Sequence, residues 1–419
     1  MKYKTYNCNS FNIYTIKTDR FKTSHLEVIF KNVLKKEEIG TYSFLADMLS
    51  EGCKKYPRKK DLITRFEELY KIVIYASTMR VGNVIDLHVS LDFINPEYIE
   101  DEGYIEDVIK TLFEVINNPN VCNDEFDLKT FNIVKERLRR EINSLKENPV
   151  KQSIKEAIKT MDSNSPTSYE ILGTIEELEN ITPAKLYNAY KSLRKNFKVD
   201  VFLIGNLDMD NVASLIKKYF KNRYIVSDNF EVMVDNKETK KVKEKTMKSD
   251  NIQTNLVMLF NLKNLSELEK NITLNCFNYL YGSGGLTSKL YKSIREENSL
   301  CYAINSMYLK YDKLLMVQIS LDNCNVKKAI SLVKKELKSM QNGNFSEEEV
   351  RDAINNMVIS LDMSLDNNIA ILNNYVFNIY DKLPSIEERK EYFKKLTKED
   401  IVNVSKKVKL NTIFTLEGR

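Results

Sequence analysis

The segment Gly282 to Tyr302, GSGGLTSKLYKSIREENSLCY, holds the residue types in this chain best suited to binding chemistry. Arg295 and Tyr302 lie seven residues apart within it. A guanidinium offers several fixed hydrogen-bond donors to peptide carbonyl oxygens, and a phenol can donate one hydrogen bond to a developing oxyanion. If each residue is considered alone, Arg295 is more simply an exposed helix residue and Tyr302 a packing residue at the end of a strand.

Other motifs exclude several kinds of site. Gly282-Ser283-Gly284-Gly285 lacks the Gly-Lys-Ser/Thr ending of a phosphate-binding loop and fits a helix end with a hinge. No C-x-x-C pair occurs, which argues against a zinc ribbon or a redox motif and favours six free thiols in a reducing compartment. The two histidines, His25 and His88, are far apart in sequence, and we interpret each as a packing or surface residue on a strand.

An internal repeat organises the elements that must position these residues. The helical pattern YSFLADMLSEG from Tyr42 recurs as LNCFNYLYGSG from Leu274, an offset of 232 residues, and both end in glycine. A second helical pattern ends in ELY at Tyr70 and in LCY at Tyr302, again 232 residues apart, and the strand-like segments VIDLHVSLD and LLMVQISLD follow. Near the end of each half, a helix that Thr182 or Thr397 can cap leads to a short apolar strand. Four matches in the same order indicate two copies of one unit.

The boundary between the copies is predicted in a lysine-rich stretch, residues 236–249, where apolar periodicity vanishes. This gives an N-terminal domain over 1–235 and a C-terminal domain over 250–419. The basic run KETKKVKEKTMK contains two glutamates and no aromatic residue, so we favour a solvated linker over a weak anion site. Long strands with helices packed on them predict an α+β fold with a largely antiparallel sheet in each half.

The amino-acid composition limits the classes of partner that we expect this chain to bind. Lys and Arg total 64 against 59 Asp and Glu, and the two signs are interleaved, which gives little reason to expect nucleic acid. The N-terminus lacks the apolar segment of a signal peptide, and no stretch of about 18 apolar residues could span a membrane. We therefore expect a cytoplasmic protein that binds neither nucleic acid nor membranes.

A duplicated unit of this size, with a short helix ending in glycine near its start, resembles the pitrilysin/insulinase peptidases over nearly the whole chain. The most specific likeness is the segment from Gly282, which has the family's glycine-rich turn, a Ser-Arg-Leu-Phe type helix start, an Arg-Glu pair and a Leu-x-Tyr. The helix start reads Ser288-Lys289-Leu290-Tyr291, with Lys where Arg is usual. The resemblance implies half of a clamshell and a substrate-binding pair, Arg295 and Tyr302, supported by Gly282, Gly284, Gly285 and Ser288.

The family's inverted zinc motif, His-x-x-Glu-His, is degenerate in this chain. In that motif two histidines on one helical face bind the ion, and the glutamate activates a water. The matching helix carries Ser43, Ala46 and Asp47 at these three positions. Ser43 and Asp47, with Asn132 from the helix described next, would be a poor and mostly neutral set of oxygen ligands for a hard cation, so we predict no metal and no catalytic residue in this chain.

The distal glutamate ligand of the family falls on a second helix, Phe131 to Leu145. Its apolar stripe sets a register that puts Asn132 at the ligand position. If the family's spacing from the zinc motif is instead counted from Asp47 without gaps, the ligand position falls near Glu125. A carboxylate at that place is explained by a favourable interaction with the dipole at the start of a helix. We favour Asn132.

The resemblance implies a non-catalytic subunit. In two-chain members of the family the active cavity lies between four homologous domains, and one chain carries the zinc. We therefore predict a heterodimer in which a zinc-bearing homologous subunit cleaves an extended peptide or protein and this chain lends Arg295 and Tyr302; a homodimer is the alternative state in its absence. Glu51 to Ser77 suggests a narrower likeness, to a bacterial non-peptidase-like branch associated with elongation factor P modification.

Two other functions stay open at this point. The chain could be a scaffold that holds an extended peptide at a sheet edge, with no chemistry in either chain. Least favoured is an active peptidase with an unusual metal site, which stoichiometric zinc in the purified chain would reveal.

Overall fold

The computed structural model describes residues 3–222, 224–227, 229–237 and 239–419, without the side chain of Lys146. Contacts divide the chain into two compact units, each assembled from three separate segments. Unit 1 comprises Met1–Asn143, Tyr169–Val232 and Asp366–Tyr380, and unit 2 comprises Ser144–Ser168, Met233–Leu365 and Asp381–Arg419.

A mixed sheet forms the centre of unit 1. Its six described strands lie in the order β1-β2-β8-β3-β5-β4, and within this order β2 and β8 pair in parallel while the other neighbours are antiparallel. Leu26, Val28 and Phe30 alternate along β3 and belong to the apolar core, so the residues between them form the opposite face. The strands are β1 (Lys4–Asn7), β2 (Phe11–Lys17), β3 (Thr23–Val33), β4 (Val73–Val81), β5 (Val84–Ile94) and β8 (Lys198–Gly205).

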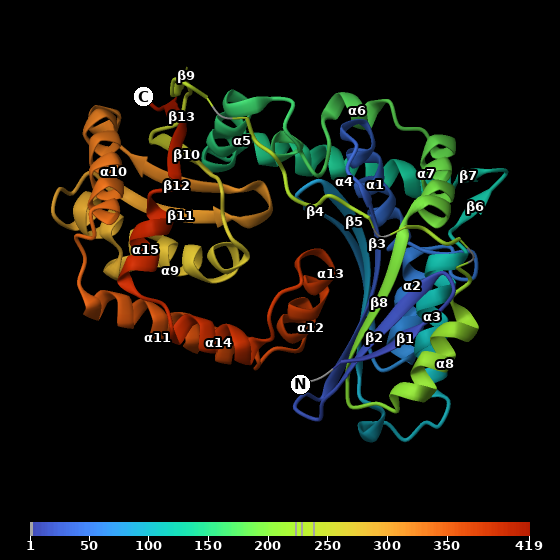
Figure 1. The fold of residues 1–419 in the computed structure, drawn as a ribbon. Coiled ribbons are helices and arrows are strands. Elements are labelled where there is room, and N and C mark those ends of the chain that lie inside the picture. Colours follow the sequence, from blue (N-terminus) through green and yellow to red (C-terminus); the bar gives the residue numbers. More distant parts are fainter. Residues whose placement is uncertain (1–2, 223, 228, 238) are drawn as a thin grey trace. The chain divides into compact units, whose positions relative to one another are not determined.

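Helices cover both faces of the unit 1 sheet. Figure 1 shows α2, α3 and α8 on one side and α12 on the other. The core side also holds α1, α4 and α7, whereas α12 contacts β3 and β8. The helices are α1 (Ile39–Leu49), α2 (Lys59–Glu68), α3 (Tyr104–Asn117), α4 (Leu128–Glu147), α6 (Ile175–Glu179), α7 (Pro183–Asn196), α8 (Met209–Tyr219) and α12 (Asn368–Val376), beside the hairpin β6 (Val121–Cys122) and β7 (Glu125–Phe126).

The sheet of unit 2 has the strand order β11-β12-β10-β13-β9 over the described residues. Its strands are β9 (Lys243–Lys248), β10 (Thr254–Leu262), β11 (Cys301–Leu309), β12 (Leu314–Leu321) and β13 (Val408–Glu417). Its helices are α5 (Pro149–Asp162), α9 (Leu274–Asn278), α10 (Val326–Gln341), α11 (Glu347–Ser364), α14 (Ile386–Lys394) and α15 (Lys398–Ser405), and the short α13 (Asn378–Asp381) lies at the division between the units. π-helical turns over Glu269–Thr273, Tyr279–Ser283 and Tyr291–Glu296 flank or follow α9.

The two sheets share one topology. Read from one edge, β4-β5-β3-β8-β2 corresponds to β11-β12-β10-β13-β9, and in both sheets the fourth and fifth strands pair in parallel. This agreement confirms the predicted α+β class with sheets rich in antiparallel pairs and accounts for the repeat in the sequence. The two capped helices are also as predicted, because the side chains of Thr182 and Thr397 accept hydrogen bonds from the first turns of α7 and α15.

Each unit takes a segment from the other half of the chain. Residues Ser144–Ser168, which hold α5, belong to unit 2, and Asp366–Tyr380 belong to unit 1. The predicted division into continuous domains over 1–235 and 250–419 therefore differs from the observed one. The reason is physical: both exchanged helices are amphipathic like any other surface helix, and periodicity does not identify the sheet on which a helix packs.

The stretch 236–249, predicted to be a linker, contains a strand. β9 pairs with β13 at the edge of the sheet, and nearly all of its side chains are exposed. An edge strand that buries almost nothing shows no apolar alternation, which is why the sequence pattern indicated a linker. Glu238 of this stretch lies outside the described residues.

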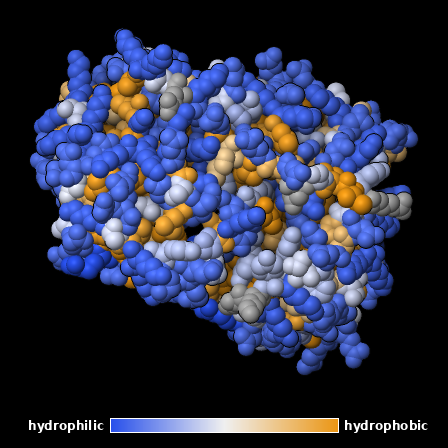
Figure 2. Space-filling model, viewed as in Figure 1, coloured by the Kyte–Doolittle hydropathy of each residue, from blue (hydrophilic) through white to orange (hydrophobic). Residues whose placement is uncertain are grey.

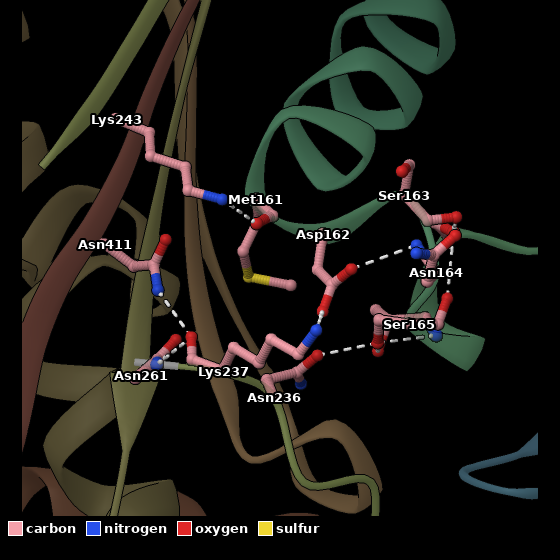
Figure 3. A network of polar contacts seen from close by, with 12 residues as sticks. Met161, Asp162, Ser163, Asn164, Ser165, Asn236, Lys237, Lys243, Asn261 and Asn411 are labelled. Atoms are coloured by element: carbon pink, nitrogen blue, oxygen red, sulfur yellow. Dashed lines mark hydrogen bonds and ion pairs between the residues drawn. The ribbon is translucent and has the colours of Figure 1, made fainter. Parts of the chain in front are cut away.

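A network of polar contacts holds the chain just before β9 (Figure 3). Asn261 and Asn411 donate from their Nδ2 atoms to the carbonyl oxygen of Lys237, over 3.2 and 3.1 Å. Asn236 is buried, and its Oδ1 accepts a hydrogen bond of 2.7 Å from the hydroxyl of Ser165. These residues of the predicted linker are thus fixed to the rest of unit 2.

The visible face of the molecule is mostly hydrophilic, with apolar residues scattered over it (Figure 2). Over the described residues, no helix combines the length and the apolar character needed to cross a bilayer. All six cysteines are free thiols, as the sequence predicts.

Candidate functional site

The three positions that match the zinc motif lie on α1, which is buried under the unit 1 sheet. Ser43 is buried, and its hydroxyl donates to the carbonyl oxygen of Ile171 and lies 2.6 Å from the hydroxyl of Thr78 on β4. Ala46 is buried and offers no polar atom. The first two positions therefore serve packing and local hydrogen bonding.

The third position, Asp47, forms an ion pair with an arginine. Nη2 of Arg137, on α4, lies 3.3 Å from Oδ2 of Asp47, and Nη1 of the same residue lies 2.8 Å from Oε1 of Glu51. Burial raises the pKa of Asp47, and the charge of Arg137 opposes this shift. The guanidinium of Arg137 thus bridges Asp47 on α1 and Glu51, which follows the end of that helix.

The predicted register of α4 needs correction. Its apolar stripe is buried as expected, and Phe131 stacks on Phe44 of α1 with ring centroids 4.7 Å apart. Asn132, however, is exposed, and the α4 residue that contacts Asp47 is Arg137. The alternative, Glu125, is exposed in β7. Apolar periodicity gives the buried side of a helix, but the crossing angle of α4 over α1 decides which flanking residue meets Asp47.

These residues do not fit zinc. Zinc prefers histidine, cysteine or carboxylate ligands in a tetrahedral set, whereas α1 offers a hydrogen-bonded hydroxyl, a methyl group and a carboxylate already paired with Arg137. Throughout the part of the chain that the structure describes, no group of three His, Cys, Asp or Glu residues is arranged to hold a metal. His25 and His88 are each engaged by a carboxylate, at 2.6 Å from Asp92 and 2.8 Å from Glu27.

Arg295 and Tyr302 lie in unit 2 and both are exposed. Arg295 belongs to the π-helical turn Tyr291–Glu296, and its guanidinium carbon lies 5.1 Å from the centroid of the Tyr291 ring. Such a contact between a cation and an aromatic face limits the directions in which the guanidinium can point.

Tyr302 lies on the edge strand β11, at a bulge. The pairing with β12 shifts between Cys301 and Ala303, so Tyr302 is the extra residue, and bulges commonly redirect a side chain. Its side chain is 53% exposed, and its hydroxyl donates to Oδ1 of Asp322 over 3.0 Å. This hydrogen bond to Asp322 raises the pKa of Tyr302, so the phenol keeps its proton and remains a donor.

Cys301 connects the two candidates. Burial raises the pKa of this thiol, and the positive charge of Arg295 opposes the shift. The backbone N–H of Ser299 donates to the carbonyl oxygen of Arg295 over 3.1 Å, so Arg295 and Tyr302 both lie near the start of the edge strand.

The glycine-rich turn before them is structural. A Cβ on Gly282 would lie 2.6 Å from the hydroxyl of Ser306, so a larger residue would push the turn away from β11. Gly285 has φ +58°, which favours glycine. Ser288 is fully buried, and its hydroxyl donates to the carbonyl oxygen of Gly285 over 2.8 Å. Gly284 lies between these fixed points, and together they set the direction in which the helix carrying Arg295 leaves the turn.

Comparison with known proteins agrees with this arrangement. Residues 180–357 match the family model described as the Peptidase M16 inactive domain. Over 412 residues, the chain is 26% identical to the probable inactive metalloprotease YmfF of Bacillus subtilis strain 168, covering 96% of this chain and 95% of that protein. The chain thus resembles M16 peptidases that are described as inactive, and the predicted resemblance is confirmed.

Solved structures confirm the fold of this M16 relative. A conserved protein from Enterococcus faecalis V583 superposes with a TM-score of 0.94 at 23% identity, covering 100% of this chain and 99% of that one. The periplasmic protease PqqL from Escherichia coli gives a TM-score of 0.74 at 14% identity and covers 98% of this chain, but this chain covers 45% of PqqL. None of these names mentions elongation factor P, so the narrower likeness to that branch stays a prediction.

Two residues of the site were missed from the sequence. Asp322 ends the strand-like segment LLMVQISLD, but its contact with Tyr302 joins residues 20 positions apart through a strand pairing. Arg137 lies in a run of mixed charges on α4 that has the pattern of an ordinary solvated face. Apart from its charge, neither residue has a feature in a single sequence that would mark it as part of the site.

Proposed function

We propose that this chain is the non-catalytic subunit of a peptidase heterodimer, in which a homologous partner supplies the zinc site. The observation that carries the proposal is the asymmetry between the two candidate sites. Arg137 pairs with Asp47 where a zinc ligand would be needed, whereas Arg295 and Tyr302 are exposed and each is oriented by a neighbouring side chain. Selection for substrate binding without zinc chemistry would leave this pattern.

The length relation to PqqL supports the same proposal. This chain has the fold of a little less than half of that protease, so a second chain of similar size would be needed to equal it. In the proposed complex Arg295 binds carbonyl oxygens of an extended peptide. Tyr302 would exchange its hydrogen bond with Asp322 for one to the developing oxyanion of the substrate, a role in which it would stabilise the transition state more than the bound substrate.

The test is co-expression of this chain with a homologue that carries His-x-x-Glu-His. We expect a one-to-one complex by light scattering and peptidase activity that neither chain shows alone. In that complex, Tyr302→Phe should lower kcat about 100-fold with little change in KM, as loss of one oxyanion donor does. Tyr392→Phe, at an exposed tyrosine of α14, is the matched control and should leave kcat unchanged. Full activity of the lone partner would refute the proposal.

A second candidate function is a peptide-binding scaffold without chemistry, and the sheet edges favour it. Over its nine residues β11 has no charged residue and no proline, whereas the opposite edge strand, β9, has three lysines. Charged edges resist pairing with another chain, and an uncharged edge invites it. Under this function, Arg295→Ala and Tyr302→Phe would weaken peptide binding and no partner would cleave the peptide. A homodimer without the partner would be consistent with either function.

A further inference from the structure

One face of the unit 1 sheet is covered by a segment from the C-terminal half of the chain. This segment, Asp366–Tyr380, contains α12, which contacts β3 and β8 (Figure 1). Ile371, Leu372 and Val376 of α12 are buried, and the side chain of Asn367 caps its first turn. We call this segment the strap.

The face beneath the strap carries a row of buried charged side chains, which we call the ionised row: Glu27, Lys31, Asp86, His88 and Asp200. Lys31 on β3 lies opposite Asp86 on β5 in the strand register. Nζ of Lys31 is 3.0 Å from Oδ2 of Asp200, and Nδ1 of His88 is 2.8 Å from Oε1 of Glu27. Positive and negative groups therefore alternate across β8, β3 and β5.

Tyr380 joins the strap to the ionised row. Its hydroxyl donates to Oδ2 of Asp86 over 2.6 Å, and Nζ of Lys31 lies 5.4 Å from the centroid of its ring. At the other end of the strap, Nη2 of Arg20 lies 2.8 Å from Oδ1 of Asp366, an exposed pair that contributes little. The contact at Tyr380 thus ties the strap to a buried carboxylate, whereas Asn368 of the strap donates to the carbonyl oxygen of Thr23 over 3.5 Å.

The segment exchanged in the opposite direction is held by apolar contacts. Ala157, Ile158 and Met161 of α5 form a buried cluster with strand residues such as Val257 and Leu259 of β10. Separating α5 from its sheet would expose this apolar surface to water. Lifting the Tyr380 end of the strap would expose charged groups, which water solvates well, besides the apolar side chains Ile371, Leu372 and Val376 of α12.

We propose that the strap is a releasable cover, latched by Tyr380 on the ionised row, whereas α5 is a permanent part of unit 2. In the closed state the strap covers the polar face of the sheet at β3 and β8. Opening costs the hydrogen bond to Asp86 and the contact between Lys31 and the ring, and hydration of the ionised row offsets part of that cost. This inference stands independently of the proposed function.

Hydrogen–deuterium exchange of the full chain, measured by mass spectrometry near neutral pH, tests the strap. After correction for intrinsic rates, amides of α12 should exchange about tenfold faster than amides of α5. Tyr380→Phe keeps the ring and removes the donor, so exchange in the strap should rise by about a further tenfold, the effect of losing one hydrogen bond to a charged acceptor. Exchange in α5 should stay the same.

Tyr392→Phe on α14 serves as the control and should change neither segment. The amides of α5 also act as an internal reference, which separates opening of the strap from general destabilisation. Equal exchange of α12 and α5 in the unmodified chain would overturn the proposal. An equal rise in both segments in Tyr380→Phe, or no rise in either, would also overturn it.

Discussion

Where the family resemblance predicts a degenerate zinc motif, the guanidinium of Arg137 pairs with the carboxylate of Asp47. Arg137 also contacts Glu51, just after the end of α1, so its positive charge faces two carboxylates. Loss of the histidines is visible in the sequence, because the motif has fixed spacing on one helix. The arginine was not predictable as their replacement, since its contact depends on how two helices cross.

This contact predicts the outcome of restoring the motif. Ser43→His, Ala46→Glu and Asp47→His together should not recover zinc binding, because the positive charge of Arg137 remains beside position 47 and repels a dication. Adding Arg137→Ala should increase the zinc content of the purified chain, measured by atomic emission against protein concentration. Stoichiometric zinc in the triple variant with Arg137 intact would contradict this account.

At the scale of secondary-structure elements, His88 on β5 makes the free energy of unfolding depend on pH through its contact with β3. Burial opposes the charge of His88, but Asp86 and Glu27 outweigh that cost and raise its pKa from 6.5 to about 9. Burial likewise opposes ionisation of Glu27, yet His88 lowers the pKa of that carboxyl. Lys31 and Tyr380 also face this site. Since the folded-state pKa of His88 is raised, its stabilisation is complete below pH 6.5 and is lost as pH rises through about 9.

The predicted loss is on the order of 3 kcal/mol in the free energy of unfolding. Denaturant titrations at several pH values from about 6 to about 10 would measure it. His88→Gln should be less stable than the unmodified chain at the acid end and should approach it at the alkaline end. Parallel curves for the two proteins would show that another group carries the pH dependence.

The hydrogen-bonded cap at the start of α15 predicts how substitutions of Thr397 change stability. The side chain of Thr397 accepts from the backbone N–H of Asp400 over 3.2 Å, and Asp400 accepts from the N–H of Thr397 over 2.9 Å. Thr397→Ala should lower the free energy of unfolding by about 1 kcal/mol, and Thr397→Ser should restore most of it. A thermal melt of both variants decides the matter, and equal melting temperatures would rule out a contribution from the cap.

Such caps were predictable because they join residues three positions apart. The repeat was predictable as well, since each copy keeps its own apolar periodicity and turn glycines. β9 was not, because it pairs through its backbone and buries almost no side chain. Nor was the strap, whose contact between Lys31 and Tyr380 joins residues from opposite ends of the chain. From a single sequence, interactions between residues close along the chain can be predicted, whereas contacts between distant residues cannot.

For the whole molecule, the exchanged segments mean that the sequence halves are not the folding units. Fragment 1–235 lacks Asp366–Tyr380 of unit 1, and fragment 250–419 lacks Ser144–Ser168 and β9 of unit 2. Expressed alone, each should melt at a lower temperature than the full chain or fail to fold. Co-expressed, 1–249 and 250–419 should assemble, and circular dichroism with size-exclusion chromatography would show it. Two fragments that are each as stable as the full chain would contradict the division.

Because unit 1 contains a segment from the C-terminal half of the chain, the ribosome finishes its sheet well before its strap. The sheet of unit 1 is encoded by residue 205, but its strap ends at Tyr380. At ~5–20 residues per second, the nascent chain spends roughly 10 to 30 seconds with a finished sheet and an uncovered ionised row. During this time unit 1 has no strap, and water can hydrate the charged side chains of the ionised row.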